Sequence, residues 1–124
     1  MTKPRRTRRS AKAAGARFER ELADYLRDRL DTPEIDRLVK TGTKDRGDVG
    51  NVRDSHGRLI AVECKNTHRL DLPAWTREAQ TEAENYGAHI GVVIHKRHGV
   101  GTPGDQWVTL TLDDLIHLIR KDTP

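Results

Sequence analysis

The chain has 124 residues, a length typical of one domain with a single hydrophobic core. Charged and hydrophobic residues each make up 34% of it and aromatic residues only 4%, so the core must be small and aliphatic. One cysteine excludes an internal disulfide, and no apolar stretch has the length of a membrane span. The basic start lacks the apolar segment of a signal peptide, so we expect a cytoplasmic protein with no membrane partner.

The positive charge is concentrated at the N-terminus. The net charge is +4, yet residues 1–14 contain no acid and six bases, namely Lys3, Arg5, Arg6, Arg8, Arg9 and Lys12. Without these six, 17 bases remain against 19 acids, so the rest of the chain has a net charge of −2. We therefore predict a basic, flexible arm over residues 1–14 and a single folded domain over residues 15–124. Such an arm either solubilises the protein or binds phosphate backbones through counterion release, and we favour the second.

The first predicted element is a helix over residues 15–31. Its apolar residues recur at helical spacing: Phe18, Leu22, Tyr25, Leu26 and Leu30. The Thr32-Pro33 pair ends it, because the residue before a proline disfavours the helical conformation. On the helical wheel Glu19 lies about 55° from the centre of the apolar face and Glu21 about 105°. Glu19 is therefore expected to lean inward and Glu21 toward solvent.

Three short strands are predicted next. They cover residues 35–39, a segment opened by Asp48, and residues 59–65, and the polar loop 40–47 could hold a phosphate. Glu63 and Lys65 project from one face of the third strand, about 7 Å apart. A tight antiparallel pairing would bring Asp48 beside Glu63, and two adjacent carboxylates favour a hard cation such as Mg²⁺ between them. A surface salt bridge would explain Glu63 and Lys65 alone, so the metal interpretation depends on the rest of the chain.

The second half continues the alternation of helices and strands. A helix over residues 73–87 starts at a proline and stops at a glycine, with an apolar stripe that includes Trp75 and Tyr86. A buried strand covers residues 90–94, a further strand residues 107–112, and Asp113 is predicted to cap a last helix. The predicted fold is α/β, with a central mixed sheet flanked by helices in the order α-β-β-β-α-β-β-α.

Over roughly residues 13–97 the sequence resembles the PD-(D/E)xK nuclease superfamily, and within it the archaeal-type Holliday junction resolvases. The resemblance rests on Gly15-Ala16-Arg17-Phe18-Glu19-Arg20-Glu21-Leu22, Thr41-Gly42-Thr43, Gly47-Asp48, Val62-Glu63-Cys64-Lys65 and Lys96. It implies a restriction-endonuclease-like core. Glycine stands at position 47 in place of the proline of the superfamily name.

The resemblance implies a set of catalytic residues, namely Glu19, Asp48, Glu63 and Lys65. It implies Mg²⁺, with Mn²⁺ as a substitute, held by Asp48, Glu63 and the carbonyl of Cys64, with Glu19 holding a metal-bound water. Lys65 would orient the water, stabilise the developing charge or act as base. Together with the basic arm and loops, DNA contacts are expected from Arg5, Arg6, Arg8, Arg9, Arg20, Lys40, Thr43, Lys44, Lys96 and Arg97.

The predicted function is that of a Mg²⁺-dependent, structure-selective DNA endonuclease. The expected substrate is branched DNA, a four-way (Holliday) junction that is resolved by paired symmetric nicks. Because each chain holds one site, paired nicks call for a C₂ homodimer, whose interface Trp75 and Tyr86 could supply unless they pack on their own sheet. The alternatives are a restriction-like or repair nuclease that acts on other DNA structures, and a non-catalytic nucleic-acid-binding module.

Overall fold

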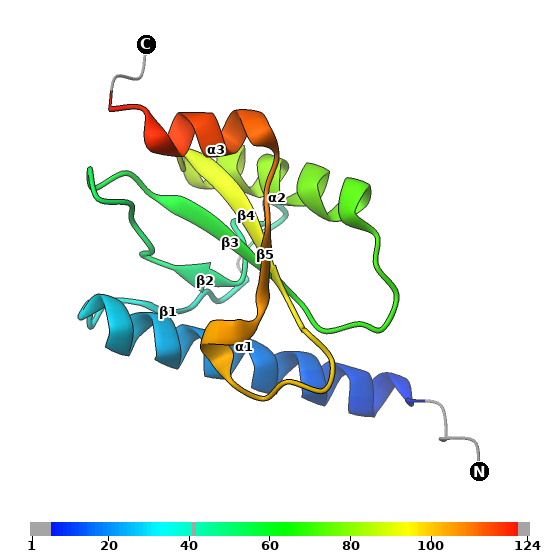
Figure 1. Cartoon of the computed structure of the whole chain (residues 1–124). Helices are drawn as coiled ribbons and strands as arrows, with labels where there is room; N and C mark the ends of the chain where they lie inside the picture. The colour runs from blue at the N-terminus through cyan, green and yellow to red at the C-terminus, as the bar shows by residue number, and fades with distance from the viewer. Residues whose placement is uncertain (1–5, 41, 122–124) are drawn as a thin grey trace.

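The computed structural model describes residues 6–40 and 42–121. Its elements follow the predicted order, as Figure 1 shows. They are α1 (Arg8–Leu30), β1 (Asp36–Arg37), β2 (Val49–Gly50), β3 (Ile60–Lys65), α2 (Leu72–Tyr86), β4 (Ile90–His95), β5 (Trp107–Thr109) and α3 (Leu112–Ile119). A 3-10 turn, η1 (Pro103–Asp105), precedes β5.

The five strands form one mixed sheet in the order β1-β2-β3-β4-β5. β1, β2 and β3 are an antiparallel meander in which Val49 lies opposite Val62. The chain then crosses over through α2, so β4 runs parallel to β3, and β5 returns antiparallel to β4. The protein is therefore an α/β fold with a mixed sheet flanked by helices, as the alternating pattern predicts.

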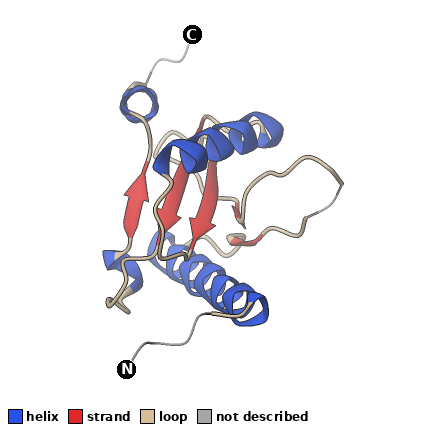
Figure 2. Ribbon diagram, turned by 90° about the vertical axis from the view of Figure 1, so that its right-hand side faces the viewer, coloured by secondary structure: helices blue, strands red, loops and turns tan. Residues whose placement is uncertain are grey.

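The two main helices pack on opposite faces of the sheet, and Figure 2 shows the strands between them. Phe18 and Leu22 of α1 pack with Val62 and with the even-numbered residues of β4. On the other face, Trp75 and Ala79 of α2 pack against Val93. Because side chains alternate along β3, Val62 and Cys64 face α1, whereas Glu63 and Lys65 face α2.

Helix α1 starts seven residues earlier than the apolar periodicity predicts. The hydroxyl of Thr7 accepts a hydrogen bond from the Ser10 N–H at 3.0 Å, which caps the first turn. The alanines at 11, 13 and 14 then favour continuation of the helix without any apolar stripe. The helix therefore includes residues 8–14, which the charge pattern assigned to a flexible arm. Arg8, Arg9 and Lys12 lie on it with exposed side chains, and Arg5 lies outside the described residues.

Other element ends differ from the predicted ones in informative ways. The cap of α3 is Thr111, whose hydroxyl accepts from the Asp114 N–H at 3.2 Å, so the prediction that Asp113 caps this helix is wrong. Asp113 instead lies in the first turn, where its charge is favourable. Helix α2 ends as predicted, with Gly87 in the left-handed conformation at φ 68°.

Candidate functional site

The candidate site begins at Asp48, which directly precedes β2. Gly47 has a φ of 102°, and a Cβ at that position would lie 2.9 Å from the carbonyl oxygen of Val62. Only glycine accepts this close, left-handed approach. The Asp48 N–H donates to the Val62 carbonyl at 2.8 Å, and the Cys64 N–H donates to Oδ2 of Asp48 at 2.8 Å. The carboxylate of Asp48, a residue only 7% exposed, is thus fixed against the end of β3.

The other side of the site comes from α2. A Cβ at Gly91 of β4 would lie 2.1 Å from the carbonyl oxygen of Ala79, so the missing side chain lets the backbone of α2 approach the sheet. This approach brings two α2 glutamates over β3. Nζ of Lys65 donates to Oε1 and Oε2 of Glu78 at 3.0 and 3.1 Å and lies 3.8 Å from Oε2 of Glu63.

Glu19 reaches the site from α1. Its carboxylate is half-buried and accepts a hydrogen bond from Nη2 of Arg37 at 2.9 Å, whereas Glu21 is exposed. The inward lean of Glu19 predicted from the helical wheel is therefore confirmed. Burial raises the pKa of Glu19, and the nearby charge of Asp48 raises it further, which marks the two carboxylates as neighbours. The four predicted catalytic residues, Glu19, Asp48, Glu63 and Lys65, thus converge at one end of the sheet.

Burial dominates the electrostatics of this cluster. It raises the pKa of Glu63, with the neighbouring Asp48 adding to the effect, and it raises the pKa of Glu82 to about 7. Burial alone would lower the pKa of Lys65, but the hydrogen bond to Glu78 and the charge of Glu63 outweigh it, so the pKa is raised. Lys65 is consequently an ammonium at neutral pH, a form that can stabilise nearby negative charge.

The donor set suits a hard divalent cation. Asp48 and Glu63 offer carboxylate oxygens, the ligands that Mg²⁺ and Mn²⁺ prefer, and Cys64 can add its backbone carbonyl. The thiol of Cys64 faces the core, and burial raises its pKa well above the ordinary value, so it is not a ligand. A further group of oxygens, one each from Asp45, Glu63 and Glu82, lies within 4.8 Å of one another.

A groove of about 560 Å³ runs between α1 and the segment that follows β1. Three bases line this groove, namely Lys12, Arg37 and Lys40. Two of the site carboxylates, those of Glu19 and Asp48, line it as well. Lys12 belongs to it because α1 begins early. The bases could attract a phosphate, and the carboxylates could hold a metal ion at the same surface. The groove is therefore suited to a phosphate that approaches a bound metal.

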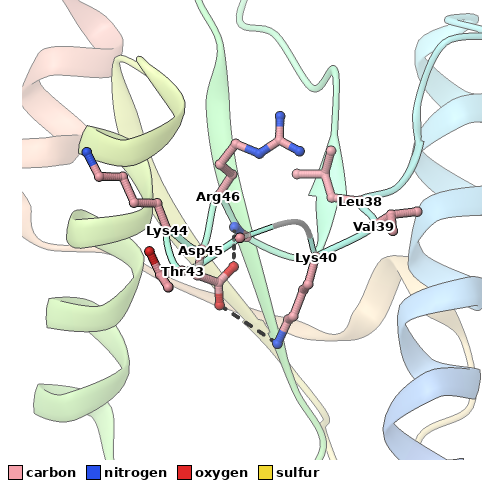
Figure 3. Close-up of a pocket in the computed structure, with 9 residues that line it drawn as sticks. Leu38, Val39, Lys40, Thr43, Lys44, Asp45 and Arg46 are labelled. Atoms are coloured by element: carbon pink, nitrogen blue, oxygen red, sulfur yellow. Dashed lines mark hydrogen bonds and ion pairs between the residues drawn. The ribbon is translucent and has the colours of Figure 1, made fainter.

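The loop after β1 encloses a smaller cavity of about 170 Å³ (Figure 3). Asp45 organises its described part, because Oδ1 accepts from the Gly47 N–H at 2.9 Å and Oδ2 lies 3.8 Å from Nζ of Lys40. Thr43 and Lys44, both predicted to contact DNA, line this cavity and are exposed.

The remaining predicted DNA contacts are dispersed. Arg20 pairs with Asp24 and Asp36 on the exposed side of α1. Lys96 donates to the Val100 carbonyl at 2.6 Å and Arg97 stacks 4.6 Å from the ring centre of Trp107. Arg6 donates to the Asn66 carbonyl at 3.1 Å, and it lines a cavity of about 140 Å³ with Lys96. None of these four bases is among the residues that line the groove.

Sequence reasoning missed the acids Asp45, Glu78 and Glu82. A signal was present for Glu82, which follows Trp75 by seven residues and so lies about 20° from it on the helical wheel, within the apolar stripe. An acid on the buried face of a helix is the same signal that identified Glu19. Nothing in the local pattern indicated Asp45, because its place depends on the path of the loop.

No protein-family model, no curated protein and no solved structure matches this chain significantly. Fold and site define its class at a coarse level: an α/β protein with buried carboxylates and a lysine at one end of a mixed sheet. Within the described residues, no helix has both the length and the apolar character that a membrane crossing needs.

Proposed function

We propose that this chain is a Mg²⁺-dependent DNA endonuclease with a restriction-endonuclease-like core, and that its substrate is a four-way junction. One observation carries the proposal: Glu19, Asp48, Glu63 and Lys65, which come from separate segments, meet at one end of the sheet. The strand order and the α2 crossover are compatible with that core. Junction selectivity is supported by the sequence resemblance.

In this proposal Asp48, Glu63 and the Cys64 carbonyl hold Mg²⁺. When bound, the ion supplies an activated water and relief of negative charge on the phosphate. Glu19 orients water from the α1 side. Lys65, kept charged by Glu78, stabilises the negative charge that develops on the reacting phosphate. The bases of the groove position the phosphate backbone beside the carboxylates.

The two alternatives make different demands on the site. A restriction-like or repair nuclease needs the same residues and differs only in the DNA structure it cuts. A non-catalytic nucleic-acid-binding module gives no reason for the buried acids Asp48, Glu63 and Glu82, whose burial costs free energy. We therefore favour a nuclease, and the sequence resemblance favours the four-way junction as its substrate.

Paired nicks require two sites, so a C₂ homodimer is part of the proposal. The aromatics considered for the interface are used within the chain: Trp75 is buried against the sheet, and the Tyr86 hydroxyl accepts from the Asn51 N–H at 3.0 Å. Large exposed apolar side chains gather instead on β5 and α3, namely Trp107, Val108, Leu112, Leu115, Ile116 and Ile119. We assign the interface to α3 and the edge strand β5, the two elements that carry these side chains.

The deciding assay compares a synthetic four-way junction with a linear duplex of the same sequence, each with Mg²⁺ and with excess EDTA. We expect paired, symmetric nicks in the junction alone, and only with Mg²⁺. Equal cutting of the duplex would favour the restriction-like alternative. A folded protein that cuts no DNA with Mg²⁺ or Mn²⁺ would contradict the nuclease proposal. Glu63→Gln is the inactive control and Glu21→Gln, at an exposed position, the active one.

A further inference from the structure

We infer that the chain has a second divalent-cation site, formed by Asp45, Glu63 and Glu82 on the α2 side of the sheet. It shares Glu63 with the proposed catalytic site but takes its other ligands from the loop after β1 and from α2. The inference concerns cation binding and the anchoring of that loop, so it does not require nuclease activity.

The three carboxylates are close enough for one ion. A cation at the centre of three oxygens that are no more than 4.8 Å apart can lie within about 2.8 Å of each. This range includes the about 2.3 to 2.6 Å typical of Ca²⁺ and the about 2.1 Å typical of Mg²⁺. The three residues come from a loop, a strand and a helix, so a cation here links all three elements.

Glu82 supplies a second, independent indication. The residue is 2% exposed, and neither of its carboxylate oxygens has a hydrogen-bond partner among the described residues. Buried carboxylates are ordinarily paired with a base or a metal. The cluster around Glu82 thus presents a buried, unpartnered acid at the point where the oxygens of Asp45 and Glu63 converge.

Among the described residues, bases pair with Asp45 and Glu63 of this cluster but not with Glu82. Lys65 makes its two hydrogen bonds to Glu78 and reaches Glu63 only at 3.8 Å. Lys40 lies 3.8 Å from Oδ2 of Asp45. Two ammonium groups are thus near four carboxylates, those of Asp45, Glu63, Glu78 and Glu82. The carboxylate of Asp48 lies beside these four. A divalent cation would supply the positive charge that the interior of the cluster lacks.

The position of Asp45 indicates what the second cation would do. Its backbone carbonyl accepts from Nδ2 of Asn85 on α2 at 2.8 Å, and its Oδ1 from the Gly47 N–H at 2.9 Å. The loop is therefore already attached to α2 and to the turn before Asp48. A cation on Asp45 and Glu82 would strengthen this attachment and hold the loop that presents Lys40 at the groove and Lys44 at the smaller cavity.

The test is equilibrium dialysis of the full, metal-free chain against Ca²⁺. We expect two Ca²⁺ per wild-type chain. Glu82→Gln and Asp45→Asn should each lose one of them, with at least a tenfold weaker affinity for the lost ion. Asp48→Asn should lose the other ion, and Glu84→Gln, at an exposed position on the same helix, should keep both. Circular dichroism verifies that each variant is folded.

The outcomes separate this inference from the nuclease proposal. If Glu82→Gln and Asp45→Asn bind Ca²⁺ as the wild type does, the second site is wrong, and a proton shared between Glu63 and Glu82 explains the cluster. The same holds if the wild type binds one ion that only Asp48→Asn removes, which leaves the catalytic site intact. One ion that Glu82→Gln removes and Asp48→Asn retains would support this site and contradict the proposed catalytic metal. Binding of no ion would overturn both.

Discussion

At the scale of single residues, the site depends on a lysine surrounded by acids. Lys65 is held by Glu78 and Glu63, and these contacts keep it protonated. We predict that Lys65→Ala lowers the rate of junction cleavage by about 10²-fold or more, because the developing charge loses its stabilising cation. Asp48→Asn and Glu63→Gln should abolish cleavage through loss of the metal.

Binding measurements separate a catalytic from a structural cause in these three variants. Each should bind a four-way junction in Ca²⁺ within a fewfold of the wild type, measured by fluorescence anisotropy, because none of them supplies a base to the groove. Loss of binding together with loss of the folded far-UV spectrum would show that the residue acts on the fold instead.

Gly47 is the residue whose backbone places Asp48. We predict that Gly47→Ala lowers the free energy of unfolding by about 1–3 kcal/mol, since a Cβ would meet the Val62 carbonyl in a left-handed conformation. Gly57→Ala is the matched control, because Gly57 has a φ of 78° with open space around its missing side chain. Urea unfolding of both variants isolates the cost of the clash, and equal losses of stability would refute it.

At the scale of elements, the start of α1 carries much of the basic charge. Deleting residues 1–14 would remove two helical turns together with Ala14, which is buried, so substitution is the cleaner test. We predict that the triple variant Arg8→Gln, Arg9→Gln and Lys12→Gln weakens binding to every DNA similarly. The log–log salt slope should fall by up to about 0.9 per lost phosphate contact.

The control for the salt slope is Arg29→Gln, at the far end of the same helix. It should leave the slope unchanged. If the triple variant also keeps the wild-type slope, the first turns of α1 do not touch the DNA backbone.

The packing of α2 on β3 makes stability depend on pH. The pKa of Glu82 rises from 4.5 to about 7 on burial, so the folded chain binds more protons than the unfolded chain between these values. This contribution is full at low pH and is lost as the pH rises through about 7. In EDTA, Tm should fall between pH 5.5 and 7.5, on the order of 5 °C.

Glu82→Gln removes the titrating group, so its Tm should vary less over the same pH range. Differential scanning calorimetry at matched ionic strength measures both proteins. Parallel pH profiles for the variant and the wild type would show that Glu82 has the same pKa in the folded and unfolded states.

At the scale of the whole molecule, the prediction concerns assembly. We expect DNA-free protein to sediment as a dimer, twice the chain mass of 14.1 kDa. Ile119→Lys, at a position that is 69% exposed on α3, should give a folded monomer because it places a charge in the proposed interface.

Leu70→Lys is the control for this experiment, because Leu70 is also exposed but lies in the loop before α2. It should remain a dimer. A wild-type monomer that still makes paired nicks would show that the dimer forms only on the junction. A wild-type monomer that makes single nicks would favour the nuclease that acts on other DNA structures.

The sequence by itself determined which way individual side chains point. Helical spacing turned Glu19 inward, and strand alternation placed Glu63 and Lys65 on one face, because side-chain direction follows from the local backbone period. The element order α-β-β-β-α-β-β-α could be predicted for the same reason. The N-caps of α1 and α3 were harder to predict from the sequence. Thr7 and Thr111 each cap their helix with a single hydroxyl, which is a weaker signal than an apolar stripe.

Only the tertiary structure decided which of these side chains meet. Glu82 reaches Glu63 because Gly91 lets α2 approach β4, a contact between segments far apart in the chain. Asp45 joins them because Asn85 and Gly47 hold its loop. Such meetings depend on strand order and on the distance between helix and sheet, which arise from packing of the whole core rather than from any local period.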